Sequence, residues 1–329
     1  MSSPVAELTM IEAVNAALQY EMSVDENILV LGEDVGANGG VFRATDNLQQ
    51  HFGEMRVIDT PLAESLISGM AIGLAVQGFK PVAEIQFMGF IYTAFDQFIC
   101  HASRMRNRTR GRLSCPMVLR APFGGGIHAP EHHSESTEAI FAHVPGIRVV
   151  IPSSPARAYG LLLAAMRDPD PVVFLEPKRI YRAQSELVID DGQALPLDVC
   201  FTLRQGSDLT LISWGAMLQE TLQAAQSLAQ QGIDAEVIDL ATIKPIDKLT
   251  ILESVEKTGR CVIVCEAAKT GAVAAEISAI IAEEGLTSLL APIIRVSGHD
   301  TVMPLFKLEQ YYMPSVAQII TAAKKVMEF

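Results

Sequence analysis

The sequence predicts an α/β protein of two domains, each a mostly parallel sheet with helices on both faces. Short apolar runs alternate with longer stretches of helical periodicity along nearly the whole chain. This alternation is typical of parallel sheets whose faces are covered by helices. It fails once, in a polar stretch around residues 176–206, and then restarts. A chain of 329 residues is also long for a single core, so we expect two domains of unequal size.

Each element follows from the apolar pattern. Buried strands are expected at residues 27–31, 81–87, 117–119, 147–151, 171–175, 209–213, 235–240, 261–265 and 293–296. Helices are expected at residues 9–22, 64–77, 92–106, 155–167, 217–231, 246–258, 272–284 and 315–327. We therefore expect one domain at residues 1–190, a linker at 191–205 and a second domain at 206–329.

Composition narrows the class of protein. The formal net charge of −13 repels phosphate backbones, so nucleic-acid binding is not expected. A membrane span is not expected, because there is no uncharged apolar run of about 18 residues. Five cysteines without a C-x-x-C pair, and a start without signal-peptide character, indicate reduced thiols in the cytoplasm. Charged residues make up only 19%, which indicates that other subunits cover part of the surface.

The first segment that can carry chemistry ends at Glu64. Thr60 is expected to cap a helix and Pro61 to occupy its first position, which places Glu64 in the first turn. One interpretation is an acidic residue favoured by the helix dipole. The other is a buried carboxyl with a raised pKa, because the helix carries Gly69 and Gly73, which permit close approach of a neighbour.

The second segment follows the strand at residues 81–87. Open parallel sheets bind ligands beyond the carboxyl ends of their strands. Gln86 could reach a polar group there, and Phe90 could stack on a flat ring. The alternative is that Phe87 and Phe90 pack in the core.

The third segment is a loop that begins with three glycines at residues 124–126 and continues through His128, His132 and His133. The glycines indicate a mobile or tightly turned loop. The histidines, with Glu131 and Glu135, could hold a metal, but their spacing matches no known zinc motif. An acid–base histidine is the better interpretation. G-x-G-x-x-G, Walker and G-x-S-x-G motifs are absent from the sequence.

Taken together, these segments resemble the beta subunits of the pyruvate and branched-chain 2-oxo acid dehydrogenases. The resemblance covers nearly the whole chain, in order, and includes segments of several residues in both halves. These are LGEDVG at 31–36, GGVF at 39–42, DTPLAE at 59–64, AEIQF at 83–87, GGG at 124–126, HS at 133–134, PG at 145–146, IPSSP at 151–155, DPVVFLEP at 170–177, VIDL at 237–240, KTGR at 257–260 and KKVM at 324–327.

The resemblance implies a pyrimidine-binding domain, a transketolase C-terminal-like domain and a share in a thiamin diphosphate site. Glu64 is then the carboxylate that hydrogen-bonds the aminopyrimidine ring, and Phe90 stacks on that ring. Leu62 and Gln86 line the pocket. His133 is the loop histidine near the reacting carbon, with the neighbouring histidine as the alternative.

The same resemblance implies metal ions and partner chains. The family's structural potassium ion corresponds to Met117, Ala165, Met166, Asp168 and Asp170. No Gly-Asp-Gly segment for a diphosphate occurs here. An alpha subunit is therefore expected to hold the diphosphate and Mg²⁺ in an alpha2-beta2 heterotetramer.

The implied reaction is oxidative decarboxylation of a 2-oxo acid with acyl transfer to a lipoyl group of a partner acyltransferase. Pyruvate is favoured, and the branched-chain substrate 3-methyl-2-oxobutanoate (2-oxoisovalerate) is the alternative. The rival classes are a complete thiamin enzyme such as a transketolase, a non-catalytic scaffold subunit and a metal-dependent hydrolase built on the histidines. The missing Gly-Asp-Gly segment argues against the first.

Overall fold

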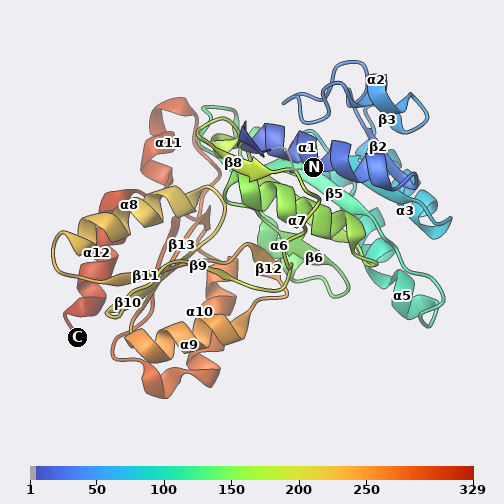
Figure 1. The fold of residues 1–329 in the computed structure, drawn as a ribbon. Helices are drawn as coiled ribbons and strands as arrows, with labels where there is room; N and C mark the ends of the chain where they lie inside the picture. Colours follow the sequence, from blue (N-terminus) through green and yellow to red (C-terminus); the bar gives the residue numbers. More distant parts are fainter. Residues whose placement is uncertain (1–4) are drawn as a thin grey trace. The chain divides into compact units, whose positions relative to one another are not determined.

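The structure, a computed structural model, describes residues 5–329 and divides into two compact units. The first contains the described residues up to Phe123 together with Ile140–Leu197. The second contains Gly124–Ala139 together with Asp198–Phe329. Each unit has a largely parallel sheet with helices packed against it (Figure 1). The α/β class with two domains that the sequence predicts is therefore confirmed.

The sheet of the first unit is parallel and runs in the order β6-β7-β5-β4-β2-β3. Its strands are β2 (Ile28–Gly32), β3 (Val57–Asp59), β4 (Lys80–Glu84), β5 (Val118–Phe123), β6 (Arg148–Val150) and β7 (Val172–Pro177). Most of their residues are buried, because helices cover the sheet. This is why these strands are continuous apolar runs in the sequence instead of alternating patterns.

A local capping signal in the sequence marks the start of the first long helix of this unit. Thr9 forms a capping box with Glu12 at the start of the first long helix, which packs against α7. The helices are α1 (Met10–Val24), α2 (Leu48–Phe52), α3 (Glu64–Val76), α4 (Phe95–Cys100), α5 (Met105–Arg108) and α7 (Pro155–Arg167). The unit also contains the 3-10 turns η1 (Met88–Thr93), η2 (Ala102–Arg104) and η4 (Lys178–Ile180), and α6 (Glu138–Ala142) lies where the chain re-enters this unit.

Two expectations about elements are wrong. The single helix expected at residues 92–106 is broken into α4, η2 and α5. His101 leaves the helical region with φ −123° and ψ −64°, and Ser103 Oγ donates to the Ile99 carbonyl. The polar stretch at 176–206 contains two strands, β8 (Ser185–Ile189) and β9 (Phe201–Arg204). β8 pairs antiparallel with β1 (Val5–Thr9) and β9 with β11. Most of their residues are not buried, so neither strand stands out as an apolar run in the sequence.

The second unit has a sheet of order β14-β13-β10-β11-β9, parallel except for the edge strand β9. The other strands are β10 (Leu209–Ser213), β11 (Ala235–Asp239), β13 (Cys261–Ala268) and β14 (Ile294–Gly298), and the unit also contains β12 (Thr242–Lys244). The helices are α8 (Met217–Ala229), α9 (Lys248–Thr258), α10 (Val273–Glu284), α11 (Phe306–Tyr312) and α12 (Val316–Met327), with 3-10 turns η3 (Glu131–His133) and η5 (Leu286–Ser288).

Alternation along β10 divides the core of the second unit between the two sheet faces. Leu209 and Leu211 belong to the apolar cluster formed with α8 and α12. Thr210 points to the other face, where it hydrogen-bonds Ser254 and Thr258 of α9. Helices therefore cover both faces (Figure 1). Within residues 5–329, every helix is too short or too polar to cross a membrane.

Candidate functional site

The helix that carries Glu64 begins later than expected. Its first residue is Glu64 and its N-cap is Ala63, so the prediction of Thr60 as the cap is wrong. The Thr60 N–H donates to the Gly32 carbonyl at 2.9 Å, which holds Thr60 at the end of the sheet, and helical bonding starts from the Ala63 carbonyl. Glu64 nevertheless lies in the first turn, where the helix dipole favours an anion.

Glu64 is half-buried in this chain, so of the two interpretations the one of a fully buried carboxyl is not supported by this chain alone. The expected close neighbour at the glycines of α3 is not present among the described residues. A Cβ at Gly73 would meet nothing within 4 Å, and one at Gly69 would meet Gln97 Oε1 at 3.8 Å. Within residues 5–329, α3 is therefore open at Gly73, whereas Gln97 lies over Gly69.

Thr93 joins the two predicted site segments. Its Oγ1 lies 3.2 Å from Glu64 Oε2, to which it donates, and 3.2 Å from the carbonyl oxygen of Phe90. The carboxylate at the start of α3 and the aromatic residue of η1 are thereby brought together. The sequence pattern does not single out Thr93, because a threonine within an apolar segment carries no motif.

The aromatic residues beyond β4 bear on two interpretations from the sequence, which were stacking on a ligand ring and packing in the core. Phe87 packs edge to face against Phe42 and Phe90, with centroid separations of 5.5 and 5.4 Å. Phe90 is half-buried, so part of its ring faces outward. Leu62 is 72% exposed. Phe87 and Phe90 are both half-buried and pack against each other, and Leu62 presents apolar surface beside the segment of Glu64.

Acidic groups gather near Glu64. Burial raises the pKa of Glu33, and the charges of Asp34 and Glu64 add to the shift. Gln86 Nε2 lies 3.5 Å from Asp34 Oδ2, a long contact that keeps the amide beside this acidic group. The sequence singled out Gln86 and Glu64 but neither Glu33 nor Asp34.

A buried ionic network links β4, the strand that leads to Gln86, with β5 and β7, and the sequence pattern does not single it out. Arg120 of β5 is 1% exposed, and its guanidinium donates to Glu176 at 2.6 and 3.0 Å and to Glu84 at 2.8 Å. Tyr181 donates to Glu176 Oε2 at 2.6 Å. Glu84 ends β4, two residues before Gln86. The sign of this network in the sequence is a charged residue within each of three otherwise apolar strands.

Burial acts to lower the pKa of Arg120, but the charges of Glu176 and Glu84 outweigh it and raise the pKa. Burial raises the pKa of Glu84 against the opposing charge of Arg120. The pKa of Tyr181 is raised well above its ordinary value by burial and by the Glu176 carboxylate. Arg120 therefore stays a cation and Tyr181 a neutral donor.

The glycine loop belongs to the second unit and is tightly turned. Gly124 and Gly126 have φ of +85° and +82°, a region that favours glycine. A Cβ at Gly124 would lie 2.0 Å from Glu266 Oε1, and one at Gly125 would lie 2.3 Å from Met303 Cε. Of the two alternatives left by the sequence, the structure shows the tight turn.

The three histidines of the loop have different environments. His132 and His133 share the 3-10 turn η3, where His132 is exposed and His133 is half-buried. His128 is paired with Glu309, 3.1 Å from its Nδ1. Among residues 5–329, no three His, Cys, Asp or Glu side chains are grouped so as to hold a metal ion. This geometry gives the zinc alternative no support.

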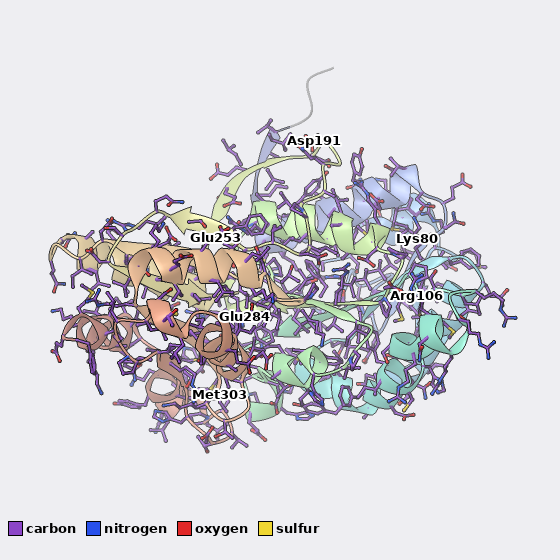
Figure 2. The ribbon with its side chains drawn as sticks, turned by 90° about the horizontal axis from the view of Figure 1, so that it is seen from below. Lys80, Arg106, Asp191, Glu253, Glu284 and Met303 are labelled. Carbon is purple, nitrogen blue, oxygen red and sulfur yellow. The ribbon has the colours of Figure 1, made fainter. Side chains whose placement is uncertain are left out.

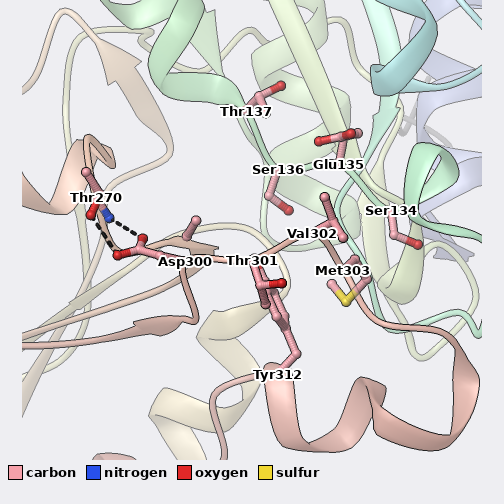
Figure 3. A pocket seen from close by; sticks show the side chains of 11 residues that line it. Ser134, Glu135, Ser136, Thr137, Thr270, Asp300, Thr301, Val302, Met303 and Tyr312 are labelled. Carbon is pink, nitrogen blue, oxygen red and sulfur yellow. Dashed lines mark hydrogen bonds between the residues drawn. The ribbon is translucent and has the colours of Figure 1, made fainter.

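A pocket of about 500 Å³ lies beside the end of this loop, within the second unit (Figure 3). Hydroxyl groups of Ser136 and Tyr312 and the thioether of Met303 line it. One side is fixed by Asp300, which accepts hydrogen bonds from the Thr270 N–H and Oγ1 at 2.8 and 2.7 Å. The pocket offers the loop a mostly apolar neighbourhood that also carries hydroxyl and carboxylate groups.

Glu138 lies buried where the loop ends. Its side chain is fully buried, and burial raises its pKa to about 8, with a contribution from the Glu266 charge. Trp214 Nε1 donates to its Oε1 at 3.3 Å, which opposes the shift. Glu138 is therefore a neutral acid near pH 7.

The residues expected around potassium come together at one end of the first unit's sheet. The Met117 carbonyl accepts from the Val172 N–H at 2.9 Å, and the Asp170 N–H donates to Asp168 Oδ1 at 2.8 Å. Asp168 pairs with Arg148 at 2.8 Å. Asp170 pairs at 2.8 Å with Arg106, an exposed side chain of α5 (Figure 2). Ala165 and Met166 lie in the last turn of α7, just before them in the chain.

Comparisons with known proteins first define the class. The transketolase pyrimidine binding domain matches residues 6–184, and the transketolase C-terminal domain matches residues 200–319. A solved structure described as a split gene transketolase, inactive beta4 tetramer, superposes with a TM-score of 0.80 over 98% of this chain and 99% of that one. Its sequence is 23% identical, so it supports the fold alone. The chain thus has the transketolase-type architecture.

Curated relatives then define the family. The pyruvate dehydrogenase E1 component subunit beta of Bacillus subtilis is 50% identical over 325 residues, which are 99% of this chain and 100% of that protein. The proteins of that name from Staphylococcus epidermidis and Acholeplasma laidlawii are 49% and 48% identical, over 99% and 98% of this chain and 100% and 98% of theirs. The chain belongs to the family of pyruvate dehydrogenase E1 component beta subunits. The resemblance stated from the sequence is therefore confirmed.

Proposed function

We propose that this chain is the beta subunit of a thiamin-diphosphate-dependent enzyme that decarboxylates pyruvate oxidatively and transfers the acetyl group to a lipoyl group. The main observation behind this proposal is that Thr93 contacts both Glu64 and the backbone of Phe90. These contacts place Glu64 beside Phe90, just beyond the carboxyl end of β4. The family relationship supports pyruvate, because the relatives named above carry pyruvate in their names. A 2-oxoisovalerate enzyme remains the alternative substrate class.

The residues fit one half of the cofactor. A half-buried carboxylate, a partly exposed phenyl ring and an exposed leucine suit a flat, nitrogen-containing ring. Glu64 would hydrogen-bond and hold a proton at a ring nitrogen, Phe90 would stack, and Leu62 and Gln86 would line the pocket. Thiamin diphosphate supplies the electron sink for decarboxylation when bound. His133 would deliver a proton during acyl transfer, because it is the more enclosed histidine of η3.

The other half requires a partner. The sequence has no Gly-Asp-Gly segment to anchor a diphosphate, so we assign the diphosphate and Mg²⁺ to an alpha subunit in an alpha2-beta2 heterotetramer. The open position at Gly73 of α3 and the exposed Leu62 support a covering chain at this site. A lipoylated acyltransferase is the proposed acceptor of the acyl group.

We also propose a structural potassium site at Met117, Ala165, Met166, Asp168 and Asp170. Carbonyl and carboxylate oxygens are suitable donors for a hard cation. The two arginines paired with the aspartates compete for the same oxygens, so the carbonyls must supply much of the binding. A higher melting temperature in potassium chloride than in choline chloride, abolished by Asp168→Ala, would support the site.

The test uses the chain reconstituted with its alpha partner. Pyruvate should give the higher kcat/KM, and 3-methyl-2-oxobutanoate the lower. Glu64→Gln keeps the size and one hydrogen bond but cannot exchange a proton. It should slow deuterium exchange at the thiazolium carbon by at least about tenfold, equivalent to about 1.4 kcal/mol. Nuclear magnetic resonance of quenched samples follows this exchange.

Glu54→Gln is the matched control, since Glu54 is an exposed glutamate of the same unit and outside the proposed site. It should exchange as the wild type does. An exchange rate in Glu64→Gln equal to wild type would show that Glu64 is only a helix-start residue. Activity with neither 2-oxo acid would overturn the proposed function.

A further inference from the structure

The histidine loop, Gly124–Ala139, is held by two buried carboxylates from distant elements. Glu266 of β13 accepts from the Gly125 N–H at 3.2 Å and from Ser136 Oγ at 2.7 Å. Glu309 of α11 accepts from the His128 N–H at 3.0 Å and from its Nδ1 at 3.1 Å. These carboxylates are 4% and 3% exposed, so water competes little for their hydrogen bonds.

The four contacts bracket His133. His128 and Gly125 precede it and Ser136 follows it, so both arms of the loop are tied to the second unit. Between them the His133 N–H donates to the Pro130 carbonyl at 2.9 Å, which forms the turn η3. The loop is thus fixed at its two arms and folded locally at its tip. These ties hold the backbone on both sides of His133, and the position of the backbone sets where its imidazole can reach.

The backbone of the glycine turn is shaped to fit Glu266. Any side chain at Gly124 would occupy the space of the Glu266 carboxylate, as the 2.0 Å separation shows. Gly125 lies equally close to Met303. Gly124 and Gly125 are therefore explained by a backbone that lies directly on a carboxylate and a thioether, and Gly126 by its positive φ.

We propose that Glu266 and Glu309 are positioning residues that set the place of His133 for acyl transfer to the lipoyl group. The proposal rests on the proposed function for its kinetic consequence but not for its structural one. It also separates the histidines by role: His128 ties the loop down, and His133 acts at the reacting carbon. Loss of a tie lowers the fraction of molecules with His133 in place, so kcat falls while KM for the 2-oxo acid is unchanged.

The structural test is hydrogen exchange of the loop peptide in the alpha–beta complex. Glu309→Ala removes the acceptor for two loop donors and should speed exchange of this peptide by at least about tenfold. Glu309→Gln retains an acceptor oxygen and should restore much of the protection. Ser136→Ala tests the Glu266 tie without removing a buried carboxylate, which keeps the experiment decisive if Glu309→Ala fails to fold.

The matched control is Glu236→Gln. Glu236 is 3% exposed and lies in the same unit, where it is bonded to Ser254 and Lys257 and not to the loop. It should destabilise the unit without loosening the loop peptide selectively. If the loop peptide exchanged its amide hydrogens at the wild-type rate in both Glu309→Ala and Ser136→Ala, the two carboxylates would not hold the loop, and the proposal would be overturned.

The kinetic test compares two acceptors. Glu309→Ala should lower kcat for lipoyl acylation about tenfold and leave pyruvate decarboxylation with ferricyanide as oxidant within about twofold of wild type. Glu309→Gln should rescue most of the acylation. A loosened loop with wild-type acylation would overturn the positioning role. A wild-type complex inactive with every 2-oxo acid would instead overturn the proposed function. The hydrogen-exchange data would still show whether Glu266 and Glu309 hold the loop.

Discussion

Both units place buried carboxylates near the carboxyl ends of their central strands, but they compensate the charge differently. In the first unit Glu84 and Glu176 share one buried arginine, Arg120. In the second unit, Glu266 accepts hydrogen bonds from a backbone N–H and a hydroxyl. Glu138 keeps a proton and is therefore neutral near pH 7. A group compensated by a fixed cation holds its structure over a wide pH range, whereas a group compensated by a proton does not.

The contrast between the two units predicts that the largest loss of stability follows substitution of Arg120. Arg120→Met leaves two buried carboxylates without a cation, and breaking a buried ion pair in this way costs about 3–5 kcal/mol. Urea unfolding at neutral pH should show this loss of stability. The triple variant that adds Glu84→Gln and Glu176→Gln removes both charges as well and should recover most of the lost stability.

Arg106→Met is the control for losing an arginine in the same unit. The Arg106–Asp170 pair is exposed, with 48% and 38% of the side chains accessible, so its loss should change stability by about 1 kcal/mol or less. If Arg120→Met were no more harmful than Arg106→Met, the buried network would be a minor contributor, and the contrast between the units would fail.

The next effect is expected at the glycine turn on Glu266. Gly124→Ala combines the strain of a positive φ with a Cβ 2.0 Å from a carboxylate oxygen. Gly232→Ala measures the backbone term alone, because Gly232 has φ +81° and nothing within 4 Å of its Cβ, in the same unit. Gly232→Ala should cost about 1–2 kcal/mol and Gly124→Ala clearly more. Equal losses on thermal unfolding would mean that Glu266 moves aside freely.

The sequence predicted those parts of the molecule whose signals are local. Apolar runs located the strands, and the rule for parallel sheets placed Gln86 and Phe90 beyond a strand end. The Thr60 cap was wrong because a strand backbone contact with Gly32 outweighed a local helix signal. Glu266 and Glu309 lie 141 and 181 residues from the loop positions they bind, and no local pattern encodes such a contact. Arg120 was missed for the same reason, since its partners lie on other strands.

A smaller effect, dependent on pH, is expected at Glu138. Its pKa is about 8 in the folded chain against an ordinary 4.5. Between these values the folded state holds a proton that the unfolded chain has released, so stability falls as pH rises from 4.5 to 8. Glu138→Gln has no proton to lose and should be the more stable protein at pH 8, by at least about 1 kcal/mol or about 2–4 °C in melting temperature.

The advantage of Glu138→Gln should shrink as the pH falls and level off below 4.5, where the glutamate is neutral in both the folded and the unfolded state. Melting curves at a series of pH values provide the measurement. A Glu138→Gln advantage independent of pH would indicate a packing effect and not proton compensation.

The smallest effect concerns Trp214, which donates to Glu138 Oε1 and thereby favours the charged carboxylate. Trp214→Phe removes this donor, so the pKa of Glu138 should rise further above 8. The variant also loses buried surface, but that loss is the same at every pH. The difference in unfolding free energy between wild type and variant should therefore grow from pH 5 to pH 9 by about 0.5–1.5 kcal/mol, the usual contribution of one hydrogen bond. In Glu138→Gln there is no proton to titrate, so adding Trp214→Phe should cost the same at every pH. A pH-dependent cost of Trp214→Phe in the Glu138→Gln background would show that another group, not Glu138, carries the proton, and the assignment of proton compensation to this carboxyl would be wrong.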